Sequence, residues 1–270
     1  MKVLISADIE GTNSTVVWPE TEMGQHDYES YFRPRMAKEV SRVASGIHSV
    51  DQEGQILIKD AHDYARNLIP ELLPEYTLLH RGWEGSPCSM MAGLTKDTDG
   101  VFYTGYHAGA RSMGNPLSHT MNTRNVSVMI NGHFASEFEI NSYYAAYMGV
   151  PVVFIAGDSD ICQTAKSFNP NIRTVSTKTG AHNAVISRHP AVSDQELESV
   201  AREAMEALKK DKDQFTFPLP KHFDIVIHYK DVKDAYPNSF FPGAKLVDTD
   251  KVAFSSDDWY ECLVALKFIL

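Results

Sequence analysis

The sequence predicts an α/β fold, a mostly parallel sheet flanked by helices with a smaller α+β C-terminal domain. Short apolar runs alternate with helical patterns over the first 160 residues, a rhythm typical of parallel sheets covered by helices. Two of these runs, ILI at 56–58 and VVFIA at 152–156, contain no polar residue, as expected for strands buried on both faces. Near residue 192 the pattern changes, which predicts a second unit.

The elements of the first part follow in order along the chain. A first strand over 3–7 precedes a helix over 35–50, in which apolar residues recur at helical spacing. Further strands are expected at 56–59, 101–105 and 126–130, the last one followed by an Asn131-Gly132 turn. A helix near 137–148 ends at Gly149. A fifth strand then covers 152–156.

The later segment begins with a capping box, in which Ser193 and Glu196 can each satisfy a free backbone amide. A helix is expected after it, then a strand over 222–229 and a closing helix over 257–269. We therefore expect two domains, an α/β metal-binding catalytic domain over 1–190 and a smaller α+β domain over 191–270. The last helix can pack back on the first domain.

Composition excludes several classes of protein. The chain has 270 residues, 43% hydrophobic and 22% charged, with a net charge of −10, so it is globular and is not a coiled coil. An acidic chain without a basic cluster is a poor binder of nucleic acid or anionic membranes. No membrane helix and no signal peptide is expected. Three scattered cysteines favour reduced thiols and a cytoplasmic location.

Carboxylates and imidazoles follow four consecutive predicted strands. Ligands of open parallel sheets bind beyond the carboxyl ends of the strands, so these side chains are candidates for one site. Mixed His and carboxylate ligands without a thiolate suit zinc or a similar divalent ion. The candidates, in chain order, are Asp8, Glu10, Asp60, His62, His107 and Glu137.

Two long loops, 82–93 and 108–121, are rich in Gly, Met and small residues and poor in charge. They can form mobile walls of a site or a subunit interface, and both interpretations stay open. His119 lies in the second loop and is a candidate acid, base or nucleophile.

A magnesium phosphatase of the haloacid-dehalogenase type is an alternative. Asp8-Ile-Glu10-Gly-Thr12 resembles the DxDGT start of those enzymes, and Asp158 and Asp160 resemble their late acidic motif. The second acidic position is Glu10, one methylene longer than Asp, which misplaces the general acid. This interpretation also leaves the three candidate histidines without a role.

A set of short motifs in one order resembles the M55 metallopeptidases, a family of D-aminopeptidases. The resemblance spans roughly residues 1–160 and is weaker beyond. It is carried by Ser6-Ala-Asp-Ile-Glu-Gly11, Asp60-Ala-His62, Gly105-Tyr-His-Ala108, Ser118-His-Thr-Met121, and Glu137 with Asn141 at the start of a helix.

The resemblance implies a site for two divalent metal ions, most simply Zn²⁺. Asp8 matches the bridging carboxylate, Glu10 and Glu137 the ligands of one ion, and His62 and His107 those of the other. His119 matches the catalytic histidine. The resemblance also implies a self-compartmentalising homo-oligomeric ring, a pentamer or decamer.

The charge of this site suits amide hydrolysis. Three carboxylates against two divalent ions leave a net positive centre, which favours an oxyanion in the transition state. His119 can then donate a proton to the leaving amine or stabilise the tetrahedral oxyanion, and we favour these roles over covalent attack. Asp60 and Asn141 are candidates for orienting the ligands from outside.

The sequence thus predicts a zinc-dependent aminopeptidase or amidase that acts on short peptides, D-amino acid peptides among them. Two alternatives besides the phosphatase stay open. One is a dinuclear amidohydrolase acting on another amide, such as a γ-glutamyl amide. The other is a metal-binding or assembly module without catalytic activity.

Overall fold

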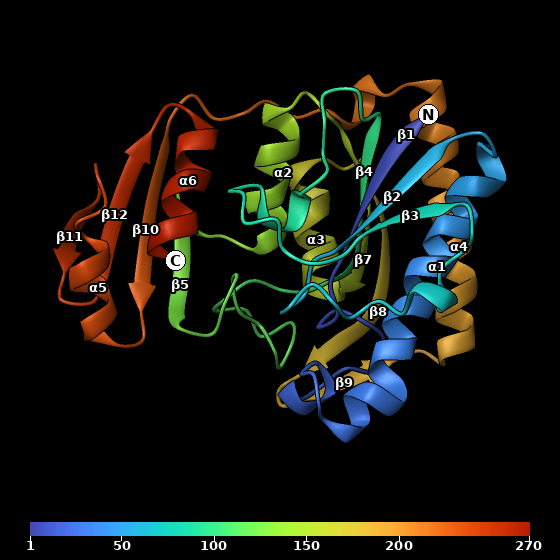
Figure 1. Ribbon diagram of the computed structural model, residues 1–270, viewed down its shortest axis with the longest axis horizontal. Coiled ribbons are helices and arrows are strands. Elements are labelled where there is room, and N and C mark those ends of the chain that lie inside the picture. The colour runs from blue at the N-terminus through green and yellow to red at the C-terminus, as the bar shows by residue number, and fades with distance from the viewer.

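The computed structural model describes residues 1–270 and contains two sheets (Figure 1). Seven strands form the larger sheet in the order β3-β2-β1-β4-β7-β8-β9, parallel except for β9. Their bounds are Lys2–Ala7 (β1), Gln55–Asp60 (β2), Thr77–His80 (β3), Gly100–Tyr106 (β4), Val152–Asp158 (β7), Arg173–Ala181 (β8) and Ala184–Ser187 (β9). The predicted α/β class is confirmed, and β7 is buried along its whole length as its composition predicts.

Helices cover both faces of this sheet (Figure 1). The pair α1 (Arg33–Val50) and α4 (Pro190–Lys210) packs on one face, and α2 (Glu137–Tyr147) and α3 (Ser159–Phe168) pack on the other. No helix is both long enough and apolar enough to cross a membrane.

The second sheet has the order β11-β12-β10-β5-β6 and is antiparallel. It consists of Asn125–Ile130 (β5), His133–Phe134 (β6), Phe223–Tyr229 (β10), Lys245–Asp248 (β11) and Lys251–Ser256 (β12), with α5 (Val232–Asn238) and α6 (Trp259–Ile269) packed on it. In Figure 1 it lies at the left, and α6 stands between it and α2.

The expectation that 126–130 is a strand of the parallel sheet is wrong. The strand forms, but β5 pairs with β6 and with β10, antiparallel in both cases. Asn131 and Gly132 both have positive φ, the conformation of a tight hairpin turn. That turn reverses the chain, so Glu137 reaches the site from a hairpin and the start of α2.

The two sheets do not divide the chain at residue 190. β5 and β6 join the later strands, whereas α4, beyond residue 190, packs against α1 on the parallel sheet. One buried cluster contains Leu4 and Tyr103 of the parallel sheet together with Ile225 and Trp259 of the C-terminal part. This cluster therefore joins the two sheets, with α6 packed against α2 through Tyr143 and Trp259 at 5.1 Å between ring centroids, while a second buried cluster lies between the parallel sheet and helices α1 and α4.

The expected start of α4 is also wrong. The helix begins at Pro190 after His189, whose ring accepts a hydrogen bond from the Ala191 amide. Ser193 lies inside the helix and is buried. Proline is favoured at the first helical position because it has no N–H to satisfy there, and this signal outweighs the Ser193–Glu196 pattern.

Strand register sets the position of the site. Ala7 of β1 lies opposite Asp60 of β2 and Thr104 of β4. The segments that leave β1, β2 and β4 therefore start at one edge of the sheet, as expected for parallel strands.

Candidate metal centre and active-site cleft

Six of the candidate side chains meet at this edge. Asp8 and Glu10 follow β1, His62 follows β2, and His107 follows β4. Glu137 is the first residue of α2, and His119 lies in the loop between β4 and β5. All of them line the cleft or lie buried directly behind it.

One group consists of Asp8, Glu10 and His62. His62 Nδ1 lies 3.2 Å from Asp8 Oδ1 and 3.2 Å from Glu10 Oε2. Its other ring nitrogen, Nε2, lies 2.9 Å from the carbonyl oxygen of Thr21. A hydrogen bond to that carbonyl fixes the proton on Nε2 and leaves Nδ1 free as a ligand.

A second group consists of Asp8, His107 and Glu137. His107 Nε2 lies 3.7 Å from Asp8 Oδ2 and 3.5 Å from Glu137 Oε1. The His107 Nδ1 lies 2.9 Å from the Ala108 carbonyl oxygen, so a backbone carbonyl also orients this ring, but through the opposite nitrogen from that of His62. Asp8 belongs to both groups, one carboxylate oxygen facing each.

The buried atoms of these groups fit divalent metal ions. Glu10 Oε2 and His107 Nε2 are buried and make no hydrogen bond, although a buried polar atom without a partner is costly. The ligand atoms within each group lie within 4.8 Å of one another. Carboxylate oxygens and imidazole nitrogens are ligands that zinc accepts.

The electrostatics of the cluster also call for cations. Burial and the neighbouring Glu10 raise the pKa of Asp8 well above its usual value. Burial alone lowers the pKa of His107, but Glu137, Glu10 and Asp8 outweigh it and raise that pKa to about 10. Three carboxylates packed out of water thus stabilise positive charge between them.

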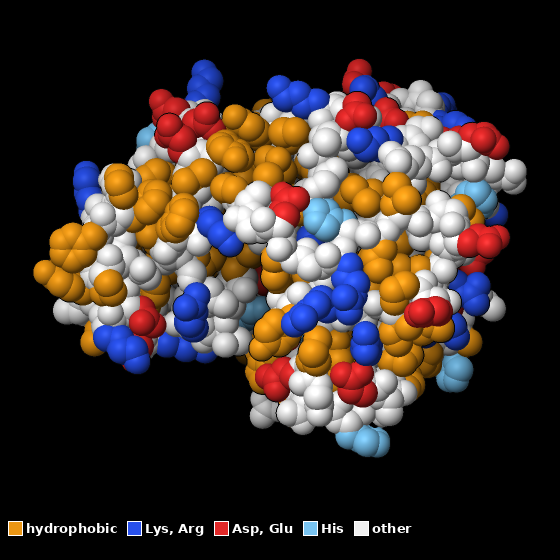
Figure 2. Space-filling model, in the orientation of Figure 1, with side chains coloured by type: hydrophobic (Ala, Val, Ile, Leu, Met, Phe, Trp, Pro, Cys, Tyr) orange, Lys and Arg blue, Asp and Glu red, His pale blue; other side chains and the backbone are white.

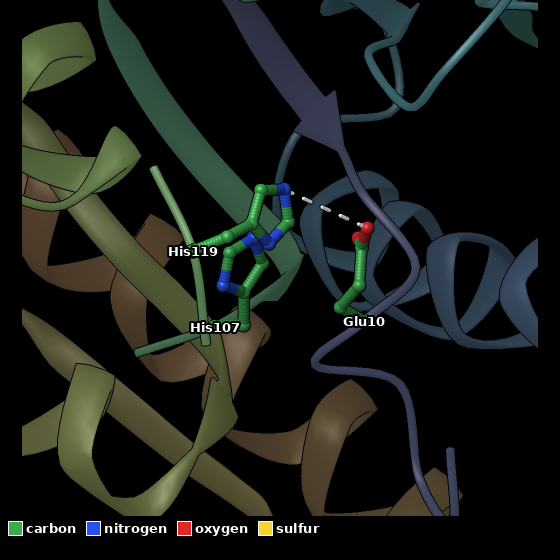
Figure 3. Close-up of side chains that lie close together, drawn as sticks. All are labelled: Glu10, His107 and His119. Atoms are coloured by element: carbon green, nitrogen blue, oxygen red, sulfur yellow. Dashed lines mark ion pairs between the residues drawn. The ribbon is translucent and has the colours of Figure 1, made fainter. Parts of the chain in front are cut away.

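His119 forms a third group with Glu10 and His107, whose ligand atoms also lie within 4.8 Å of one another (Figure 3). Its ring stacks on His107, with 4.4 Å between centroids and 12° between planes. His119 Nε2 lies 3.5 Å from Glu137 Oε1 and 4.0 Å from Glu10 Oε1, and Nδ1 faces the Leu117 carbonyl at 2.9 Å. Burial and the neighbouring His107 lower its pKa.

Asp60 and Asn141 lie outside this cluster. The Asp60 carboxylate accepts hydrogen bonds from the backbone amides of Asn67 and Leu68, and the Asn67 side chain in turn donates to the carbonyl of His62. Asp60 therefore fixes the loop that carries His62. Asn141 donates to the Tyr106 hydroxyl at 2.9 Å and contacts none of the six clustered side chains.

Three buried polar residues that the sequence analysis did not connect with the metal site support the ligand loops. Asn115 donates to the Glu10 carbonyl and to Asp158, and Asp158 accepts from the amide of Ala108, next to His107. Lys178 donates to the carbonyls of Glu10 and Thr15. Asp158 is thus a structural residue that also caps α3.

The cluster opens into a cleft of about 1050 Å³. Both Gly-rich loops contribute to its walls, through Trp83 to Ser86 and through Pro116 to Met121. This agrees with the interpretation of these loops as walls of a site.

Comparisons with known proteins agree on one family. The model of the Peptidase M55 family, described as D-aminopeptidase, matches residues 1–268. A curated D-aminopeptidase of Bacillus subtilis strain 168 is 30% identical over 270 residues, covering 98% of this chain and 95% of the relative. A solved structure, the Zn-dependent D-aminopeptidase DppA from Bacillus subtilis, a self-compartmentalizing protease, matches with a TM-score of 0.88 and 27% identity. The match covers 100% of this chain and 96% of the chain in the solved structure.

Proposed function

This chain belongs to the M55 peptidase family, and from that premise we propose that it is a zinc-dependent aminopeptidase that releases the N-terminal residue of short peptides, D-amino acid peptides among them. One observation carries the proposal. Two carboxylate–histidine groups share Asp8 at the bottom of a cleft, in a chain that a Zn-dependent D-aminopeptidase matches over its full length.

Two zinc ions are held by five residues in this proposal. Asp8 would be shared by both ions, Glu10 and His62 would hold one, and His107 and Glu137 would hold the other. The pairing differs from the one that the family resemblance implies, which joins Glu10 with Glu137 and His62 with His107. Support comes from the 3.2 Å approach of His62 to Glu10 and the 3.5 Å approach of His107 to Glu137.

Zinc bound at these residues supplies Lewis acidity, which polarises a peptide carbonyl and makes water more acidic. The chain's own catalytic residue is His119. Its contact with the Leu117 carbonyl holds the proton of the neutral ring on Nδ1. Nε2 therefore takes a proton from the attacking water and passes it to the leaving amine. A trapped acyl-imidazole on His119 would instead identify it as a covalent nucleophile.

The alternative functions that the sequence left open are less well supported than the aminopeptidase. The family is one of peptidases, which favours a peptide over other amides and excludes the phosphatase and the non-catalytic module. Asp158, the late acidic residue of the phosphatase reading, is occupied by backbone amides of Ile161 and Ala108.

The chain also forms a homo-oligomeric ring in this proposal, because its structural relative is a self-compartmentalizing protease. Large apolar side chains are exposed on α5, on α6 and in the loop after α5, namely Tyr236, Phe268 and Phe240. Hydrophobic atoms gather over this part of the surface in Figure 2. The C-terminal sheet, rather than the loops of 82–122, is then the main subunit contact. The three free cysteines suit a reducing cytoplasm.

A panel of matched D- and L-dipeptides and tripeptides tests the function, with zinc and with a chelator. We expect chelator-sensitive release of the N-terminal residue from D-peptides. Cleavage of L-peptides alone would keep the metal centre and remove the D-preference. No release from any peptide would contradict the proposed function.

A further inference from the structure

A group of three cations lines the active-site cleft on the side of the antiparallel sheet, and the metal centre does not use them. They are Arg124 before β5, Lys230 after β10 and Lys267 in α6. Figure 2 shows Lys and Arg side chains beside the hollow below α6. The chain as a whole has a net charge of −10, so a group of three positively charged side chains at one cleft stands out from the rest of the molecule. We call them the basic rim.

The basic rim is a connected structure. The Lys230 amide donates to the Arg124 carbonyl at 3.0 Å, and the Arg124 guanidinium donates to the Leu270 carbonyl at 2.8 Å. Lys267 lies one helical turn before Leu270. The three side chains therefore come from backbone segments that are held together.

Two of these cations have no anionic partner in the structure. Neighbouring lysines on this side are paired, Lys233 with Asp231 and Lys251 with Asp248. Lys230 and Lys267 take part in no ion pair, and both are exposed to the cleft. They are therefore free to bind an anion that enters it.

The distance from the metal centre to the basic rim is short. The Met121 amide donates to Glu137 Oε1 at 2.7 Å, and Arg124 lies three residues further along the chain. Three residues span at most about 11 Å. Beyond its first peptide bond a dipeptide extends about 4 Å and a tripeptide about 7 Å. The long side chains of the basic rim span the remaining distance to its far end when that bond is at the metal centre.

Charges of the opposite sign lie elsewhere along the cleft. Glu22, Asp63 and Glu84 line it from the segments that follow β1, β2 and β3. A peptide with a free ammonium and a free carboxylate is therefore oriented by the cleft, with its carboxylate toward the basic rim.

We propose that Lys230 and Lys267, with Arg124 beside them, bind the C-terminal carboxylate of the substrate and so select free di- and tripeptides over longer or blocked chains. This inference rests on the proposed aminopeptidase function and names its substrate class. Exposed ammonium groups bind a carboxylate as point charges without fixed geometry, so the subsite discriminates by charge and length.

The experiment compares the best-cleaved dipeptide of the panel, with its free carboxylate, against the same dipeptide as its amide. The quantity measured is the ratio of kcat/KM for the acid to kcat/KM for the amide, in the zinc-loaded enzyme. We expect the wild type to favour the acid. In the double variant K230M/K267M the ratio should fall by about fivefold to tenfold, as expected for two exposed charge pairs, through a higher KM for the acid.

The control is Lys221→Met, an exposed lysine that does not line the cleft, which should leave the ratio unchanged. A wild-type ratio of one or less, or a ratio that the double variant leaves unchanged, would overturn the inference while the aminopeptidase function stands. If the wild type cleaves neither the acid nor the amide, the proposed function fails and the inference fails with it.

Discussion

Two contacts fix the side chain of His119. Its Nδ1 lies at hydrogen-bond distance from the Leu117 carbonyl, and its ring stacks on the ring of His107. It is less buried than the other five clustered residues, with 14% of its side chain exposed. A proton donor to a leaving amine needs both features, a fixed orientation and access to the substrate.

Replacing His119 with Ala should therefore lower kcat by about 10²- to 10⁴-fold, the usual contribution of a positioned acid or base. Zinc content should stay at the wild-type value, because the five proposed ligands are intact. Peptide turnover and metal analysis of the same preparation check this. His26→Ala, a change in a ring that is 90% exposed, is the control. Loss of zinc from the His119 variant would show that His119 is a ligand.

Lys178 is buried, and its ammonium donates to the carbonyl of Glu10 itself. Lys178→Met removes one of the two side-chain donors to the Glu10 carbonyl, Asn115 being the other, and the donor to the Thr15 carbonyl. We expect zinc affinity to fall about 10- to 100-fold, as for other residues that orient metal ligands. Competition with a chromophoric chelator measures it.

Lys166→Met is the matched control, because Lys166 also donates to two backbone carbonyls, those of Pro170 and Ile172, away from the site. Equal zinc affinity in the two variants would mean that Lys178 has no role in positioning Glu10.

At the residue scale, the sequence predicts the candidate metal ligands but not the buried polar residues that hold the ligand loops in place. Asp8, His62 and His107 follow apolar strands, and the strand-end rule for parallel sheets finds them. Lys178 and Asn115 are single polar residues, far along the chain from Glu10. Only the fold shows that β8 and the second Gly-rich loop bring them to the Glu10 carbonyl.

At the element scale, three ion pairs of different burial join helices α1 and α4, because Asp194 pairs with both Arg35 and Lys38 and Glu198 pairs with Arg42. Arg35 is buried and pairs with Glu39 and Asp194, the latter 6% exposed, whereas Arg42 and Glu198 are each 43% exposed at 2.9 Å. The contributions of a buried and an exposed ion pair to stability can therefore be compared within the same two helices.

Asp194→Ala should lower the free energy of unfolding by about 3 kcal/mol, because it leaves part of a buried guanidinium charge without a partner. Glu198→Ala should cost at most about 1 kcal/mol, since exposed pairs contribute little. Denaturant unfolding of both variants tests this. Similar losses for the two would contradict the assignment of Arg35 as the buried link between α1 and α4.

The Asp194 pair also predicts a pH dependence. Burial raises the pKa of Asp194, but hydrogen bonds from Arg35 and Lys38 outweigh it and hold that pKa below its usual value. A lowered folded-state pKa gives stability that is complete above the unfolded value, near 3.9, and is lost as pH falls through the folded value. The difference between wild type and Asp194→Ala should therefore shrink below about pH 4 and stay constant from pH 5 to 7.

Element prediction succeeded where the local signal and the packing agree. The helix over 33–50 and strands β1, β2, β4 and β7 were expected within a few residues of their observed bounds. β5 was expected in the wrong sheet because an apolar run does not specify its partner. The Asn131-Gly132 turn is the local signal that does specify a hairpin, and it therefore indicates an antiparallel partner for β5.

At the scale of the whole molecule, metal and fold are expected to be coupled. Asp8, Glu10 and Glu137 are packed together out of water, and without cations this costs stability. Zinc that binds only the folded chain adds about 2.7 kcal/mol at 100 times its Kd.

Excess chelator should then lower Tm by roughly 5–10 °C, from about 2–4 °C per kcal/mol for a chain of this size. Differential scanning calorimetry measures it. In Asp8→Asn, which lacks the shared carboxylate, chelator should change Tm much less. A chelator-independent Tm in the wild type would show that zinc does not stabilise the fold.

The last prediction concerns assembly, which no local motif in the sequence could reveal. The exposed aromatic side chains Phe240 and Phe268 are 70% and 68% accessible in the single chain. An exposed apolar surface of this kind typically marks a subunit contact. Replacing both by Asp places charge in that contact and should reduce the particle to a smaller species in light scattering, with zinc content unchanged.

Leu78→Asp, at the β3 edge of the parallel sheet, changes an exposed apolar residue remote from this surface and should leave the mass unaltered. If Leu78→Asp dissociates the assembly and the Phe240/Phe268 variant does not, the subunit contact lies on the parallel sheet and the C-terminal sheet has another role.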